Sequence, residues 1–144
     1  MTDHVFIDTD VLLDVLAARQ EFLLESSKIL SSCEDGKITG YTSAICIVNC
    51  IYLLERLKIP NVKLAISNLS KIITILPCTS KDIDDSINSK FKDIEDGIQN
   101  AIAENSKKCQ ILITRNIKDY VSSKLDVMTP SQYLEKNKRI KRVP

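Results

Sequence analysis

The sequence predicts an α/β fold, a three-layer α/β/α sandwich around a central parallel sheet. Short apolar runs alternate along the chain with longer segments of helical periodicity. Two of these runs, Ile72–Leu76 and Ile111–Thr114, are continuously apolar or β-branched, which suits strands covered on both faces. The 144 residues fit one domain and contain no internal repeat. We expect this domain over residues 1–135 and a basic tail over residues 136–144.

The first half of the chain is expected to hold two short strands and four helices. They cover residues 5–7 (strand), 10–19, 21–34, 38–42 (strand), 44–57 and 61–69. Asp10 and Ser43 are placed to cap the first and third helices. Gly36 follows the second helix as a stop signal, and Pro60 separates the third helix from the fourth.

The second half is expected to hold three strands and three helices. They cover residues 72–76 (strand), 80–88, 93–105, 111–114 (strand), 127–129 (strand) and 130–136. Pro77 stops the first of these strands, and Pro130 suits the first position of the last helix because that position needs no N–H donor. Strands separated by helices favour parallel pairing.

The composition excludes several kinds of site. The three glycines are too scattered for a glycine-rich phosphate loop, and His4 is the single histidine, ahead of the first apolar run. The five cysteines are odd in number and lack the paired spacing of a zinc site. Reduced cysteines, the absence of a signal-peptide pattern and the absence of a long apolar run predict a cytoplasmic protein without a membrane partner.

The charge is unevenly divided. Residues 1–106 carry 10 basic and 16 acidic side chains, whereas residues 107–144 carry 10 basic and 3 acidic ones. Such asymmetry fits an acidic site beside a basic surface for nucleic acid, although solvated faces of different sign are the alternative. The basic tail, with Lys136, Lys138, Arg139, Lys141 and Arg142, either holds phosphates or is a solvated terminus.

Acidic residues are expected at one edge of the predicted sheet. Asp8 ends the first strand, Glu95 and Asp96 open a helix, and Asp119 lies five residues beyond the strand that ends at Thr114. Ligands bind at the carboxyl ends of parallel strands. Clustered carboxylates repel one another, and Mg²⁺ or Mn²⁺ removes that cost because both prefer oxygen ligands. Metal-activated water acting on a phosphodiester is the predicted chemistry, and helix caps and loop acids are the alternative reading.

Several segments resemble the motifs of PIN domains, the ribonuclease fold that includes VapC-type toxins. Phe6–Asp14 resembles the opening motif, and Thr42-Ser43 followed by an apolar helix is similar to the second. Glu95–Gln99 and Ile113–Tyr120 resemble the third and fourth, and Thr129-Pro130 is similar to the closing step. The resemblance covers residues 4–135 and implies a PIN-like fold with Mg²⁺- or Mn²⁺-dependent cleavage of RNA.

The resemblance also implies roles for individual residues. Asp8, Asp96 and Asp119 would be the catalytic acids that hold the metal. The residues expected to support the site or to contact RNA are Asp10, Asn49, Thr114 and Asn116 for the site, and Arg115 and Lys118 for RNA. Besides RNA, the implied partners are a cognate antitoxin near the acidic groove and a second copy of the chain in a homodimer.

One position departs from the PIN pattern. The second segment normally supplies a glutamate about six residues after Thr-Ser, where this chain has Asn49. An unpaired amide in an apolar helix would cost about 1–3 kcal/mol, so we expect Asn49 to face the acidic site and bond a carboxylate or water. Because the site loses one negative charge, two functions stay open. The first is a metal-dependent endoribonuclease, the toxin of a toxin–antitoxin pair, and the alternative is a catalytically weakened module that binds RNA or a protein.

Two other enzyme classes fit less well. Asp8-Thr9-Asp10-Val11 also matches the signature of haloacid dehalogenase-like phosphatases, in which the first aspartate is the nucleophile. Those enzymes need a late acidic pair in a glycine-containing loop, and no glycine follows Thr114. Receiver domains need an aspartate after the middle strand, where this chain has Pro77 and Cys78.

Overall fold

A five-stranded parallel sheet forms the centre of the protein. The structure, a computed structural model, describes residues 2–142. The strands are β1 (Asp3–Ile7), β2 (Ile38–Ser43), β3 (Ile73–Leu76), β4 (Ile111–Ile113) and β5 (Asp126–Met128). Their order across the sheet is β3-β2-β1-β4-β5, and every neighbouring pair is parallel. The predicted parallel sheet is therefore confirmed.

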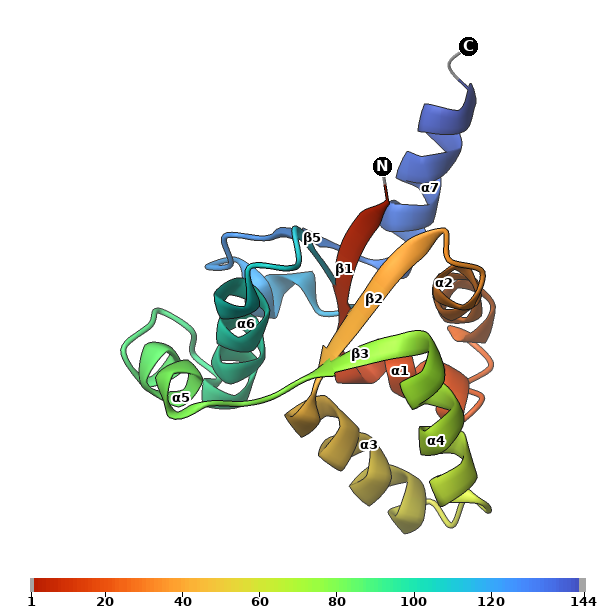
Figure 1. Ribbon diagram of the computed structural model, residues 1–144, viewed down its shortest axis with the longest axis horizontal. Coiled ribbons are helices and arrows are strands. Elements are labelled where there is room, and N and C mark those ends of the chain that lie inside the picture. The colour runs from red at the N-terminus through yellow and green to blue at the C-terminus, as the bar shows by residue number, and fades with distance from the viewer. Residues whose placement is uncertain (1, 143–144) are drawn as a thin grey trace.

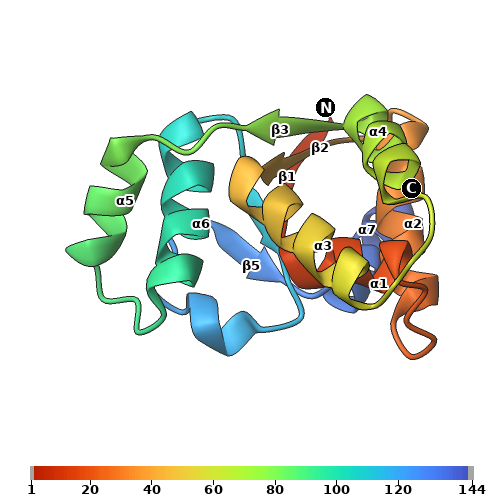
Figure 2. The ribbon, with the colours of Figure 1, turned by 90° about the horizontal axis from the view of Figure 1, so that it is seen from below.

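Helices cover both faces of the sheet and complete the predicted three layers. They are α1 (Thr9–Leu16), α2 (Leu23–Glu34), α3 (Ala44–Arg56), α4 (Val62–Ile72), α5 (Ser80–Ile87), α6 (Ile94–Ser106), a short 3₁₀ turn η1 (Ile117–Tyr120) and α7 (Pro130–Arg142). Helices α5 and α6 lie on one side, and α1, α2, α4 and α7 lie on the other (Figure 1). The view from below shows the same separation, with α3 beside α1 and α4 (Figure 2).

The core lies between these layers, and β1 and β4 contribute most deeply to it. Val5, Phe6 and Ile7 are fully buried, as are Leu112 and Ile113. Central strands of a parallel sheet are covered on both faces, which explains why their sequences are continuous apolar runs.

The cysteines belong to the packed interior. Cys33, Cys46, Cys50 and Cys109 are buried, Cys78 is half-buried, and all five are free thiols. Within the part of the chain that the structure describes, no helix is both long and apolar enough to cross a membrane.

Several predicted boundaries differ from the observed ones. Helix α1 ends at Leu16 instead of residue 19, because Ala18 adopts a left-handed backbone conformation with φ of 50°. Residue Ile72 belongs to α4, and the strand begins one residue later. Helix α7 continues to Arg142 instead of ending near residue 136, since no proline or glycine interrupts it before Pro144.

The predicted tail overlaps this last helix. Lys136 and Lys138 lie on α7, with Lys136 Nζ 3.8 Å from Asp126 Oδ2. The side chains of Arg139, Lys141 and Arg142 lie outside the described residues, as do residues 143–144. The division into a domain of residues 1–135 and a tail of residues 136–144 stays a prediction.

Candidate metal centre

Asp8 occupies the junction between β1 and α1. It is the N-cap of α1, and its Oδ1 accepts a hydrogen bond from the Thr9 backbone N–H at 2.8 Å. The sequence predicted Asp10 as this cap. That prediction is wrong, because the strand ends at Ile7 and the helix begins at Thr9, so Asp8 is the single residue between them.

The second oxygen of Asp8 faces two hydroxyl groups. Oδ2 accepts hydrogen bonds from Thr114 Oγ1 at 3.0 Å and from the Tyr120 hydroxyl at 3.2 Å. The side chain is 7% exposed, and this burial, together with the charge of Asp10, raises the pKa of Asp8 to about 7. A cation beside Asp8 would favour its ionised form, because it offsets both effects.

Asp96 comes close to Asp8 from a different element, helix α6. It lies in the first turn of α6, where Asp93 caps the helix by accepting from the Asp96 backbone N–H at 3.0 Å. The Tyr120 hydroxyl lies 3.5 Å from Asp96 Oδ1, so this one hydroxyl stands between two carboxylates. Burial, followed by the charges of Asp93, Asp119 and Glu95, raises the pKa of Asp96 to about 6.

Gly97 allows α6 to hold Asp96 in this position. A Cβ atom at residue 97 would collide with Ser86 Oγ on α5 and lie 3.1 Å from Phe91 Cβ. The Ser86 hydroxyl also donates to the Ile94 carbonyl at 2.7 Å, at the start of α6. The absence of a side chain at residue 97 therefore sets how closely the start of α6 packs against α5.

Asp10 is the third carboxylate of the group and is held by the segment after β4. Its Oδ2 accepts from the Arg115 backbone N–H at 3.0 Å and from Asn116 Nδ2 at 3.3 Å. Its Oδ1 is buried, and no described residue forms a hydrogen bond with it. Burial raises the pKa of Asp10.

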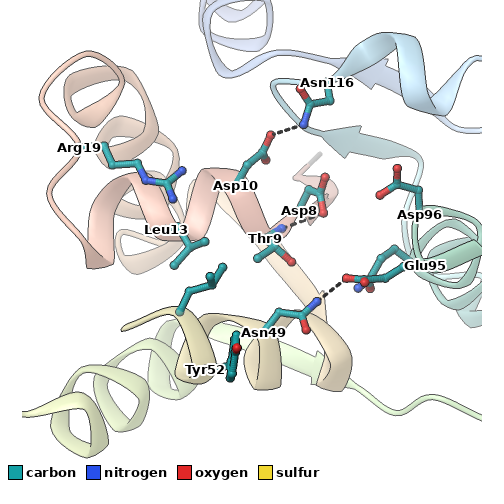
Figure 3. A pocket seen from close by; sticks show the side chains of 12 residues that line it. Asp8, Thr9, Asp10, Leu13, Arg19, Asn49, Tyr52, Glu95, Asp96 and Asn116 are labelled. Carbon is teal, nitrogen blue, oxygen red and sulfur yellow. Dashed lines mark hydrogen bonds between the residues drawn. The ribbon is translucent and has the colours of Figure 1, made fainter. Parts of the chain in front are cut away.

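These carboxylates line a cavity of about 380 Å³ (Figure 3). Four acidic residues contribute to its wall, together with three amides and one cation: Asp8, Asp10, Glu95, Asp96, Asn49, Gln99, Asn116 and Arg19. The sequence-predicted residues Asp8, Asp10, Asn49, Asp96 and Asn116 are thus brought together. Thr114 lies behind them, fully buried, and bonds Asp8.

Asn49 projects into the cavity from α3. Its Nδ2 donates a hydrogen bond to Glu95 Oε1 on α6 (Figure 3). Two other polar contacts anchor this region: Ser43 Oγ accepts from the Cys46 backbone N–H at 2.9 Å, and its hydroxyl donates to Gln99 Oε1. The start of α3 is therefore tied to the middle of α6.

Three sequence-predicted residues lie elsewhere. Asp119 is exposed on η1 and is absent from the cavity wall, although its charge contributes to the raised pKa of Asp96. Lys118 is exposed and also lies outside the wall. Arg115 points toward a buried carboxylate instead, with Nε donating to Asp14 Oδ2 at 3.0 Å and the guanidinium 3.8 Å above the Phe22 ring.

The residues that the sequence prediction did not assign to this region include Tyr120, Gln99 and Arg19. Tyr120 follows Asp119 directly, and Gln99 lies three residues after Asp96 on the same helix, so both had a local signal. Arg19 had none, because it lies beyond the end of α1 and reaches the cavity only through the path of the chain after Ala18.

The donor set fits a hard divalent cation. Among the described residues, no three His, Cys, Asp or Glu side chains form a group that could hold a metal ion by themselves. Mg²⁺ does not need such a group, because it keeps several waters and is bound through one or two carboxylates. Two observations favour a cation here: Asp10 Oδ1 is buried with no partner in the described part of the chain, and the pKa values of Asp8 and Asp96 are raised.

Several solved structures with the same fold come from toxin–antitoxin systems or are toxins. A toxin–antitoxin complex from Klebsiella pneumoniae has a TM-score of 0.67 at 22% identity and covers 88% of this chain and 97% of its own. VapBC2 from Rickettsia felis, bound to a DNA fragment from its promoter, has a TM-score of 0.60 at 14% identity. The match covers 88% of this chain and 98% of that chain. Mycobacterium tuberculosis VapC20, a Sarcin-Ricin loop cleaving toxin, has a TM-score of 0.60 at 15% identity. The match covers 75% of this chain and 86% of that chain.

These likenesses show the fold, and family membership rests on a separate match. No curated protein is similar enough to this chain to count as a match. The family model described as PIN domain matches residues 4–118, which span β1 to η1 and include every carboxylate of the cavity wall. The chain belongs to the PIN domain family.

Proposed function

We propose that this protein is a Mg²⁺- or Mn²⁺-dependent endoribonuclease that hydrolyses RNA phosphodiesters. The observation that carries the proposal is the pair Asp8 and Asp96, two carboxylates with raised pKa values that face one Tyr120 hydroxyl at the edge of an open cavity. Holding two acids so close costs free energy unless a cation neutralises them. Membership of the PIN family supports a nuclease.

We assign different roles to the residues of this site. Asp8 and Asp96 would hold the cation, and the Thr114 and Tyr120 hydroxyls would keep Asp8 Oδ2 in place. When bound, the cation would supply an activated water and neutralise phosphate charge. The positively charged Arg19 side chain, which lines the cavity wall, would attract the phosphate backbone. Asp119 would act from outside the wall, where its charge adds to the negative potential at Asp96.

The test is cleavage of end-labelled single-stranded and structured RNA by the purified protein with Mg²⁺, Mn²⁺ or EDTA. We expect metal-dependent cleavage that Asp8→Asn and Asp96→Asn each abolish. Asp84→Asn is the matched control, because it removes the same charge from an exposed position on α5. Cleavage that survives both site substitutions would contradict the proposal.

A second candidate function is favoured by Asn49 alone. A PIN-fold module with one acid fewer on α3 would bind RNA or a protein without cleaving RNA. This alternative would be supported if RNA binds the protein in Mn²⁺ and stays intact, and if Asp8→Asn leaves the affinity for RNA unchanged.

We also propose an antitoxin partner and a toxin role. The support is that two of the similar structures are a toxin–antitoxin complex and VapBC2, each of which covers 88% of this chain. A small DNA-binding protein encoded directly upstream that co-purifies with this chain and suppresses its nuclease activity is the expected finding. The predicted homodimer would be checked by light scattering of the purified chain.

A further inference from the structure

Glu95 lies where it can replace the acid that α3 lacks. It is the second residue of α6, directly before Asp96, and it shares the cavity wall with Asp8, Asp96 and Asn49 (Figure 3). This inference rests on the proposed function, because it concerns the same cation site.

The hydrogen bond from Asn49 restrains the Glu95 side chain. Glu95 is exposed, and an exposed glutamate at a helix start gains rotamer freedom by turning into solvent. Here the half-buried Asn49 amide donates to Glu95 Oε1, which keeps the carboxylate at the cavity. The two residues are 46 positions apart in sequence, so the contact depends on the packing of α3 beside α6.

The position of Glu95 is electrostatically unfavourable for the protein alone. The Glu95 carboxylate lines the same cavity wall as three other acids, Asp8, Asp10 and Asp96, so it adds a like charge to that site. Asn49 nevertheless holds it toward the other acids. A dication bound at Asp8 and Asp96 would turn this repulsion into attraction.

Glu55, the nearest acid along α3, does not fill this role. It is exposed and is not part of the cavity wall. The acids that reach the wall from the described residues are Asp8, Asp10, Glu95 and Asp96. Glu95 is the one among them that a residue of α3 holds in place.

We propose that Glu95 is an additional acid of the cation site, held there by Asn49 as its positioning residue. In this role Glu95 adds its negative charge at the cavity wall, where Asn49 holds its carboxylate. The carboxylate missing from α3 is thereby supplied by α6, and Asn49 contributes the hydrogen-bond donor that keeps it there.

The test is the affinity of the full-length protein for Mn²⁺ alone, measured by calorimetry at pH 8. Removing one carboxylate from the surroundings of a bound metal weakens the affinity for that metal by about 10-fold. We therefore expect Glu95→Gln to bind Mn²⁺ about 10-fold more weakly. The decisive variant is the double substitution Asn49→Glu/Glu95→Gln. It exchanges donor and acceptor between α3 and α6, keeps the net charge, and is expected to recover an affinity within about 2-fold of wild type. Glu55→Gln removes the same charge outside the cavity and is expected to bind as wild type does.

The outcomes separate this inference from the function on which it rests. Loss of Mn²⁺ binding in Asp8→Asn with wild-type affinity in Glu95→Gln would overturn the role of Glu95 and leave the cation site standing. An affinity in the double variant as low as that of Glu95→Gln would overturn the pairing with Asn49. Wild-type binding in Asp8→Asn, or none in the wild-type protein, would overturn the cation site itself and this inference with it. Thermal unfolding monitored by circular dichroism checks that each variant is folded.

Discussion

Asp8→Asn should stabilise the protein at pH 8 in the absence of metal, even though it removes the central acid of the proposed site. The pKa of Asp8 is raised from 3.8 to about 7 in the folded protein, chiefly by burial. Between these two pH values the folded chain holds more protons than the unfolded chain, so the free energy of unfolding falls as the pH rises from about 4 to about 7. Above pH 7 the full cost of the buried charge is present.

The size of this cost follows from the pKa difference. Each pKa unit corresponds to about 1.4 kcal/mol, so the shift from 3.8 to about 7 amounts to a cost on the order of 4 kcal/mol. An amide keeps one acceptor oxygen and cannot accept from Thr9, Thr114 and Tyr120 together, so part of the gain is lost. We expect a net gain of about 2 kcal/mol, which raises the melting temperature by about 5 °C.

The assay is thermal unfolding in EDTA at pH 5 and pH 8. Asp8→Asn should melt above wild type at pH 8 and close to it at pH 5, where Asp8 is protonated in the folded protein. Mn²⁺ should raise the melting temperature of wild type at pH 8 and leave the variant unchanged, since a ligand that binds only the folded state stabilises it. A variant that melts at or below wild type at pH 8 in EDTA would refute the argument from the raised pKa.

Three further predictions concern the framework of the site and the end of the chain. Gly97→Ala should lower the free energy of unfolding by about 1–3 kcal/mol, because its Cβ collides with Ser86 Oγ, and Ser86→Ala should recover part of the loss in denaturant titrations. Arg115→Lys should destabilise by about 2 kcal/mol, since it removes the Nε–H donor to the buried Asp14; a melting curve equal to that of wild type would contradict this. Removing residues 136–144 should weaken RNA binding at low salt and have less effect at high salt, measured by filter binding, and an unchanged affinity would rule out a phosphate-binding tail.

The alternation of strands and helices could be read from local patterns. Continuous apolar runs such as Ile111–Ile113 are typical of strands covered on both faces, and the parallel sheet confirms that interpretation. Helix ends were harder to place. Nothing local marks Ala18 as left-handed, and no glycine or proline lies near residue 136, where we expected α7 to end.

The fold class, the residue types of the candidate site and its opening motif around Asp8 could be predicted from the sequence, because these depend on periodicity and local order. Which of those residues meet follows only from the three-dimensional packing. It placed the Tyr120 hydroxyl between Asp8 and Asp96, left Asp119 outside the cavity wall, and joined Asn49 to Glu95. These outcomes depend on how α3, α6 and η1 pack around the sheet edge. Contacts between residues so far apart in sequence arise from that packing, which local patterns do not encode.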